Sequence, residues 1–173
     1  MNILTRRLTP YIFLWILLLP LCTSCEREDD VMEIFTGKTW KLSYIFLDGH
    51  SANSIDLWEG DEEAWENSMK LVKTADYFTI AFQGGTLYTG GLGGTFKAQG
   101  VRATVEGHWE ADGKTRALSF SEVKVTGTET EVMAKAFIEG LTAPMTGYSG
   151  DNANLYLHYT DGQLKKVIGL VIR

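Results

Sequence analysis

Val101-Arg102-Ala103-Thr104-Val105-Glu106-Gly107-His108-Trp109-Glu110-Ala111 has the clearest period of two in the chain. Every second residue from Val101 to Trp109 is apolar or glycine, and the residues between them are polar. This alternation is typical of an antiparallel strand that buries one face and exposes the other. Asp112-Gly113 then gives a tight turn signal, and the alternating residues 116–122 follow. The stretch therefore predicts a hairpin in an antiparallel β-sheet.

Similar alternation predicts four more strands along the chain. We expect them at Thr39–Leu47, at residues 77–82, at residues 155–159 and at Leu164–Ile172. The last two would form a hairpin around Asp161-Gly162. The glycine clusters at 84–85 and 90–94 lack the spacing of a dinucleotide fingerprint or a phosphate loop. We interpret them as a flexible hairpin with bulges.

Two helices are expected between the strands. Residues 61–74 place Trp65, Met69 and Val72 on one apolar stripe. Residues 129–141 follow the capping-box pattern Thr128-x-x-Glu131 and also carry an apolar stripe. Both helices would act as lids on a sheet or barrel. The predicted fold class is therefore mainly β, a β-rich α+β fold with two helices.

The start of the chain predicts where the protein is located. A pair of arginines precedes a short apolar run at 11–21, and Thr23-Ser24-Cys25 then places small residues ahead of a cysteine. The run is shorter than the roughly 20 residues that a membrane span needs. We therefore expect residues 1–24 to be a cleaved lipoprotein signal peptide and Cys25 to be lipidated. An ordinary secretory signal, with Cys25 incidental, is the alternative.

Residues 25–34 are predicted to be the lipidated cysteine and an acidic tether. Glu26-Arg27-Glu28-Asp29-Asp30 is nearly all charge and resembles the export tag of surface-exposed lipoproteins in one phylum of Gram-negative bacteria. A solvated spacer is the alternative interpretation. Fatty acyl chains such as palmitate would anchor the protein, since each buried methylene contributes about 0.8 kcal/mol. The expected location is the cell envelope, at the outer membrane, either within the envelope or on the cell surface, with the membrane as partner through the lipid.

Charge and cysteine content limit the possible functions. The formal net charge is −6, and taking Arg6 and Arg7 away with the leader changes it to −8. Such acidity argues against nucleic acid as a partner, because phosphate binding needs a basic surface. Both cysteines, Cys22 and Cys25, lie in the leader region. Residues 35–173 therefore form the predicted domain without a disulfide or a thiolate site, and their number suffices for one core.

No motif in the sequence predicts catalysis, a cofactor or a metal. The histidines His50, His108 and His158 are far apart in sequence, and neither a zinc-type His-Glu-x-x-His motif nor a serine elbow is present. Residues 151–154 do not match a calcium loop and are expected to be a polar turn. We therefore predict a protein that is not an enzyme. Trp58 has no strand or helix phase to bury it, which makes it the candidate contact for a ligand or partner.

Two parts of the chain resemble META (heat-shock HslJ-like) domains. Phe35-Thr36-Gly37-Lys38-Thr39-Trp40-Lys41-Leu42 resembles the opening of that family, in which a glycine and then a tryptophan begin the first strand. The family's helix and closing hairpin resemble Glu131-Val132-Met133-Ala134-Lys135-Ala136-Phe137-Ile138 with Leu141, Tyr148, Gly150, Leu155-Tyr156-Leu157 and Asp161-Gly162. The whole layout also resembles an uncharacterised family of lipid-anchored proteins. The resemblance implies an antiparallel lipocalin-like barrel or roll over residues 35–173, and it supplies no catalytic residue.

These observations favour a non-catalytic binding or accessory module at the cell envelope. Its partner would be an unknown envelope protein or a small ligand, bound near Trp58 and the glycine-rich hairpin. One alternative is a lipocalin-like carrier of a small apolar ligand, which requires a cavity of about 300 Å³ or more. Another is a hydrolase, which requires histidines and acids to meet in a cleft.

Overall fold

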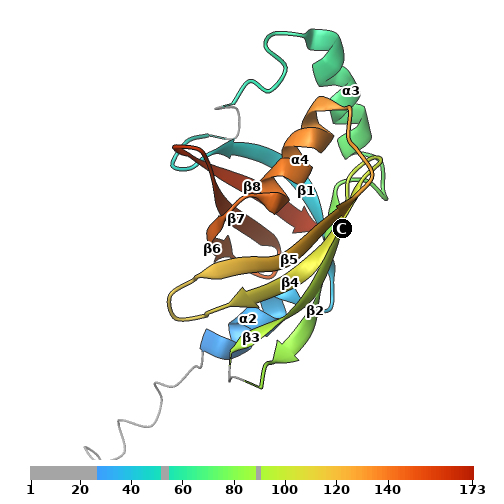
Figure 1. Ribbon diagram of the computed structural model, residues 1–173. Coiled ribbons are helices and arrows are strands. Elements are labelled where there is room, and N and C mark those ends of the chain that lie inside the picture. Colours follow the sequence, from blue (N-terminus) through green and yellow to red (C-terminus); the bar gives the residue numbers. More distant parts are fainter. Residues whose placement is uncertain (1–26, 52–54, 89–90) are drawn as a thin grey trace, which may run out of the picture.

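The computed structural model describes residues 27–51, 55–88 and 91–173, which form one eight-stranded antiparallel sheet with three helices (Figure 1). The strands are β1 (Thr39–Leu47), β2 (Thr79–Thr86), β3 (Leu92–Gln99), β4 (Thr104–Ala111), β5 (Leu118–Thr126), β6 (Met145–Gly150), β7 (Asn154–Asp161) and β8 (Leu164–Ile172). Their order in the sheet is β5-β4-β3-β2-β1-β8-β7-β6. The β-rich α+β class is thus confirmed.

The sheet curls strongly but does not close into a barrel (Figure 1). β5 and β6 are its two edge strands, and a backbone hydrogen bond from Tyr148 N–H to the Arg116 carbonyl, 3.0 Å long, links β6 to the chain just before β5. The predicted barrel or roll is therefore an open, curled sheet.

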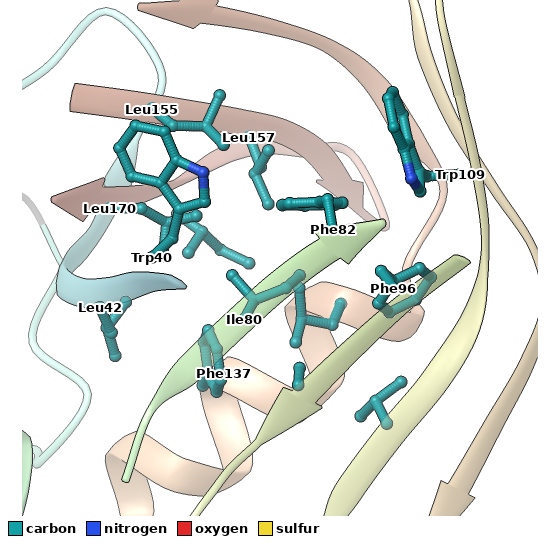
Figure 2. Close-up of a cluster of buried hydrophobic side chains, with 14 of the residues drawn as sticks. Trp40, Leu42, Ile80, Phe82, Phe96, Trp109, Phe137, Leu155, Leu157 and Leu170 are labelled. Atoms are coloured by element: carbon teal, nitrogen blue, oxygen red, sulfur yellow. The ribbon is translucent and has the colours of Figure 1, made fainter. Parts of the chain in front are cut away.

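Side chains on the inner face of the sheet, together with Phe137 from a helix, meet in one core. Figure 2 shows ten of them pointing into the same space: Trp40, Leu42, Ile80, Phe82, Phe96, Trp109, Phe137, Leu155, Leu157 and Leu170. All are buried. In the described residues the interior is packed with side chains, which leaves less room for the ligand cavity that the carrier alternative requires.

The hairpin of β2 and β3 contains the glycine clusters. Gly84 pairs with Gly94 and Gly85 with Gly93, and the register continues without a shift through the whole hairpin. The predicted bulges are therefore absent from the paired residues. A Cβ atom on Gly84 would collide with the carbonyl of Gly93, so the glycines allow the two backbones to approach closely.

The segment predicted as an acidic tether is mostly helical. α2 spans Arg27–Phe35, and its Val31, Ile34 and Phe35 are buried in the core. The Phe35 ring stacks on Trp109 with ring centroids 4.8 Å apart and planes at 9°. The spacing of the three buried residues is that of one helix face, which explains why the charged run continues into a packed helix instead of a solvated spacer.

The other two helices agree with the prediction except in detail. α3 spans Glu62–Val72, and Asp61 caps it by accepting the Ala64 N–H at 3.0 Å. Met69 and Val72 of the predicted stripe pack against the core, whereas Trp65 is 46% exposed. α4 spans Val132–Thr142 and is capped by Glu131, not by Thr128. Within the described residues, neither these helices nor α2 is long and apolar enough to cross a membrane.

Candidate functional site

Trp58, the predicted contact residue, supports the packing of two helices. Its Nε1–H donates to Ser68 Oγ at 2.8 Å, and the Ser68 hydroxyl also bonds the Glu131 carboxylate at the start of α4. Trp58 is half-buried against the core. The segment leading into α3 and the turn of β2 and β3 lie at opposite ends of the molecule (Figure 1). The structure therefore does not bring Trp58 and the glycine-rich hairpin together.

A groove of about 670 Å³ runs across the outer face of the sheet instead. Strands β1 to β5 supply its walls, because every second residue of a strand points away from the core. The lining residues are Thr39, Thr79, Ala81, Gln83, Thr95, Phe96, Lys97, Gln99, Glu106, Gly107, His108, Glu122, Lys124 and Arg173. Most of them carry hydroxyl, amide or charged groups, so the groove presents polar groups on a lining that is otherwise largely apolar.

Opposite charges pair across the strands of this groove. Lys97 Nζ lies 2.6 Å from Glu106 Oε1, and its hydrogen bond and charge lower the pKa of the Glu106 carboxyl. His108 Nε2 lies 3.6 Å from Glu122 Oε2. Exposed pairs of this kind contribute little to stability. The Lys97 and Glu106 side chains are both more than half exposed, so a partner with charges of either sign can reach them.

Gly107, one of the residues that line the groove, packs against the Phe96 ring. Gly107 lies opposite Phe96 in the pairing of β3 and β4, at a point where the pairing of β4 with β5 shifts register. A Cβ atom on Gly107 would come within 2.8 Å of the Phe96 ring. The lack of a side chain at 107 therefore leaves room for the Phe96 ring, which points into the core.

A second cluster lies on the outer face of β6 and β7. Ser149 Oγ is 2.9 Å from His158 Nε2, and His158 Nδ1 is 3.5 Å from Asp48 Oδ1, in the turn after β1. Gly147 pairs with His158 and leaves room for the diagonal contact with Ser149. Sequence reasoning missed this serine-histidine-aspartate arrangement, because its members are far apart in the chain and match no local motif.

Two tyrosines lie beside this cluster. Tyr44 of β1 and Tyr156 of β7 both pair with Gly169 of β8, which lies between them. A Cβ atom on Gly169 would come within 2.8 Å of the Tyr44 ring, so the ring covers the glycine. A hydrogen bond to Tyr156 raises the pKa of the Tyr44 hydroxyl. The pair gives this part of the outer face an aromatic character.

The cluster is open to solvent. The side chains of His158 and Asp48 are 26% and 40% exposed, and Ser149 is exposed. Besides the groove, hollows of about 310 and 400 Å³ occur on the surface, and neither they nor the groove is lined by the three residues. In the described part of the chain, no three His, Cys, Asp or Glu side chains are grouped so that they could hold a metal ion.

Comparison with known protein families shows which family the chain belongs to. Residues 26–172 match the model of a domain of unknown function, DUF4847. The chain belongs to the DUF4847 family. A solved structure of a DUF4847 family protein from Bacteroides vulgatus ATCC 8482 is similar, with 26% sequence identity and a TM-score of 0.58. The similarity covers 82% of this chain and 96% of that one. No curated protein matches the chain.

The extent of the family match agrees with the structure at the N-terminus. The match begins at residue 26, and α2 begins at Arg27. The DUF4847 domain of this chain therefore includes the helix that the charge pattern alone assigned to a tether.

Proposed function

We propose that this DUF4847 protein is a lipid-anchored module of the cell envelope that binds a partner in the outer groove and catalyses no reaction. The leader and Cys25 support the anchor, and the resemblance to META domains and to lipid-anchored families supports the location. The observation that carries the binding role is the groove of about 670 Å³ on β1 to β5. The packed interior makes the carrier alternative weaker.

The lining of the groove favours a polypeptide as the partner. Thr79, Thr95, Gln83 and Gln99 offer hydroxyl and amide groups, and the paired charges beside them suit a segment with side chains of both signs. Specific interfaces carry hydrogen-bonding groups of this kind around a less polar centre. We therefore expect an envelope protein to bind there through an extended, polar segment.

The anchor is tested by mass spectrometry of the full chain produced in a Gram-negative host. The expected mass is that of residues 25–173 with a glyceryl group and acyl chains. The variant Cys25→Ala should lack the added mass and leave the membrane fraction. An unmodified Cys25 in the wild type would contradict the anchor.

The groove is tested with a photo-crosslinker placed at Gln99. It should give a defined crosslinked protein in membranes, and the same crosslinker at Asn67, exposed on α3, should not. A second change, Thr95→Arg, puts a bulky charge into the groove and should remove the product. Equal products from both positions, or a product that Thr95→Arg leaves unchanged, would contradict binding in the groove.

A second candidate function rests on Ser149, His158 and Asp48. Their order in space is that of a nucleophilic triad, in which the histidine takes the serine proton and the aspartate orients the ring. A hydrolase of this kind would label with a fluorophosphonate in wild type but not in Ser149→Ala, and Asp48→Asn would slow the labelling. Absence of labelling in the wild type would leave the three residues as a surface hydrogen-bond network.

A further inference from the structure

We propose that the end of the domain formed by the start of α2 and by the end of β2 with the adjoining Tyr88 lies against the membrane, with Tyr88 at the lipid interface. The inference rests on the proposed lipidation of Cys25 and specifies how the anchored domain is oriented. The partner is the headgroup region of a phospholipid bilayer.

The first step is that α2 cannot swing away from the domain. Val31 and Phe35 are fully buried, and the Phe35 ring contacts Phe82 at 4.9 Å as well as Trp109 at 4.8 Å between centroids. Thr36 also forms a bridge with Phe82 of β2. Releasing the helix would expose these side chains to water, so its position in the domain is fixed.

The second step is the length of chain between the lipid and the helix. Only Glu26 separates Cys25 from Arg27, the first residue of α2. An extended chain spans at most about 3.6 Å per residue, so the two Cα atoms are within about 7 Å of each other. A nine-residue strand such as β1 is roughly 30 Å long. A connection so much shorter than the domain holds the start of α2 at the membrane surface.

The third step is what else lies at that end. Figure 1 shows the start of α2, the end of β2 and the beginning of β3 at one end of the molecule, with α3 at the other. α2 contacts both β2 and β3, so the helix and this hairpin are neighbours. Tyr88, two residues after β2, is fully exposed to solvent. Tyrosine is enriched at membrane interfaces, because its ring is apolar and its hydroxyl is polar.

The charges near this end favour a neutral membrane surface. The outward side chain of Glu110 lies beside Gly91, and Asp112 follows at the end of β4. Backbone N–H groups of Thr115 and Lys114 lower the pKa of Asp112, which therefore stays ionised near neutral pH. Carboxylates are repelled by anionic lipid. We therefore assign the contact to zwitterionic headgroups.

Site-directed spin labelling tests the orientation in the lipidated full chain. Residues 26–173 contain no cysteine, and the thiol of a lipidated Cys25 is blocked, so an introduced cysteine is labelled alone. The two positions are Tyr88→Cys and, as the matched control at the opposite end, Asn67→Cys. In vesicles of phosphatidylcholine and phosphatidylethanolamine, we expect the label at 88 to be several-fold less accessible to a water-soluble relaxation agent than the label at 67.

Two results would distinguish a failure of the proposed anchor from a failure of the proposed orientation. If mass spectrometry shows no acyl chains, the proposed anchor fails before the orientation is tested. If the acyl chains are present and both labels are equally accessible, the orientation is wrong while the anchor stands. A flexible Gly-Ser linker inserted between Cys25 and Arg27 should abolish the protection at 88. Protection that survives the linker would overturn the role of the short connection.

Discussion

Glu129 shows how one side chain can hold two distant segments together. Its Oε1 accepts hydrogen bonds from the backbone N–H groups of Val101, Arg102 and Ala103, each 2.8 Å long. These residues form the turn between β3 and β4, while Glu129 lies just before α4. Sequence reasoning placed Glu129 inside the helix, because a glutamate near a capping box resembles a first-turn residue.

Replacing Glu129 with alanine should lower the free energy of unfolding by about 2–4 kcal/mol, because three backbone N–H groups lose a charged acceptor. Urea unfolding of both proteins measures the difference. Glu66→Ala, at an exposed position of α3, is the matched control and should change stability by less than about 0.5 kcal/mol. An equal, small effect of both substitutions would show that the turn does not depend on Glu129.

Gly169→Ala should disturb the outer face without reaching the core. The added Cβ atom would push the Tyr44 ring away, and the hydrogen bond to Tyr156 would break. The pKa of the Tyr44 hydroxyl should then fall toward the ordinary tyrosine value. A titration followed by NMR of labelled tyrosine rings measures this change. Gly85→Ala is the control, because a Cβ atom there meets no atom within 4 Å, and an unchanged Tyr44 titration in Gly169→Ala would contradict the contact.

Helix α2 is the element for which the charge pattern predicts one structure, a solvated tether, and the structure shows another, a packed helix. The charged residues at its start dominate the sequence signal, whereas Val31, Ile34 and Phe35 decide its structure. The spacing of these three residues is i, i+3, i+4, which is typical of one face of a helix. The sequence therefore carries a helix signal beside the charged run, although the charge pattern alone predicts a tether.

Removal of α2 should therefore unfold the domain. A chain that begins at Gly37 loses the Phe35 contacts with Trp109, Phe82 and Tyr148. We expect it to lack a cooperative thermal transition by circular dichroism, while a chain that begins at Arg27 retains one. Phe35→Ala in the longer chain should cost about 3–5 kcal/mol. A folded protein that begins at Gly37 would show that α2 is dispensable, as expected for a tether.

The hairpin of β4 and β5 should lose stability in acid. Asp112 Oδ1 accepts the N–H groups of Lys114 at 2.7 Å and Thr115 at 2.9 Å, which lowers its pKa in the folded state. Its contribution is therefore present above the unfolded pKa, about 4, and is lost as the pH falls through the lower folded value.

Asp112→Asn should remove that part of the acid sensitivity. The stability difference between wild type and variant, from urea unfolding, should shrink between about pH 6 and about pH 3. Ser119→Asn, on the outward side of the same hairpin, serves as the control and should show no such convergence. A difference that stays constant with pH would mean that the Asp112 carboxylate does not stabilise the turn.

The stability of the whole domain depends on one continuous core that both halves of the sheet share. β1 joins the β2–β5 half of the sheet to the β6–β8 half, since it pairs with both β2 and β8. Phe35 contacts Phe82 of one half and Tyr148 of the other, which links the two halves through α2. Neither half can bury its inner face without the other.

Unfolding should therefore occur in a single transition. Tryptophan fluorescence, which reports on Trp40 and Trp109 in the core, and far-ultraviolet circular dichroism should give the same midpoint in urea. Two separated transitions would show that the halves of the sheet fold independently.

The sequence by itself determined most strands, both capped helices and the absence of disulfides. Period-two alternation identified six strands, because a strand that buries one face must place apolar residues at every second position. The same rule missed β3, whose glycines have no side chains to alternate, and β6, in which Tyr148 is the one buried residue of six.

Only the tertiary structure decided where the surfaces lie. The groove draws residues from five strands, and Asp48, Ser149 and His158 meet although about a hundred residues separate the first from the others. Trp58, unassigned by periodicity, is held by Ser68 ten positions later. Local sequence patterns reflect which face of an element is buried, whereas the meeting of exposed faces depends on how the sheet curls and on the register between distant strands.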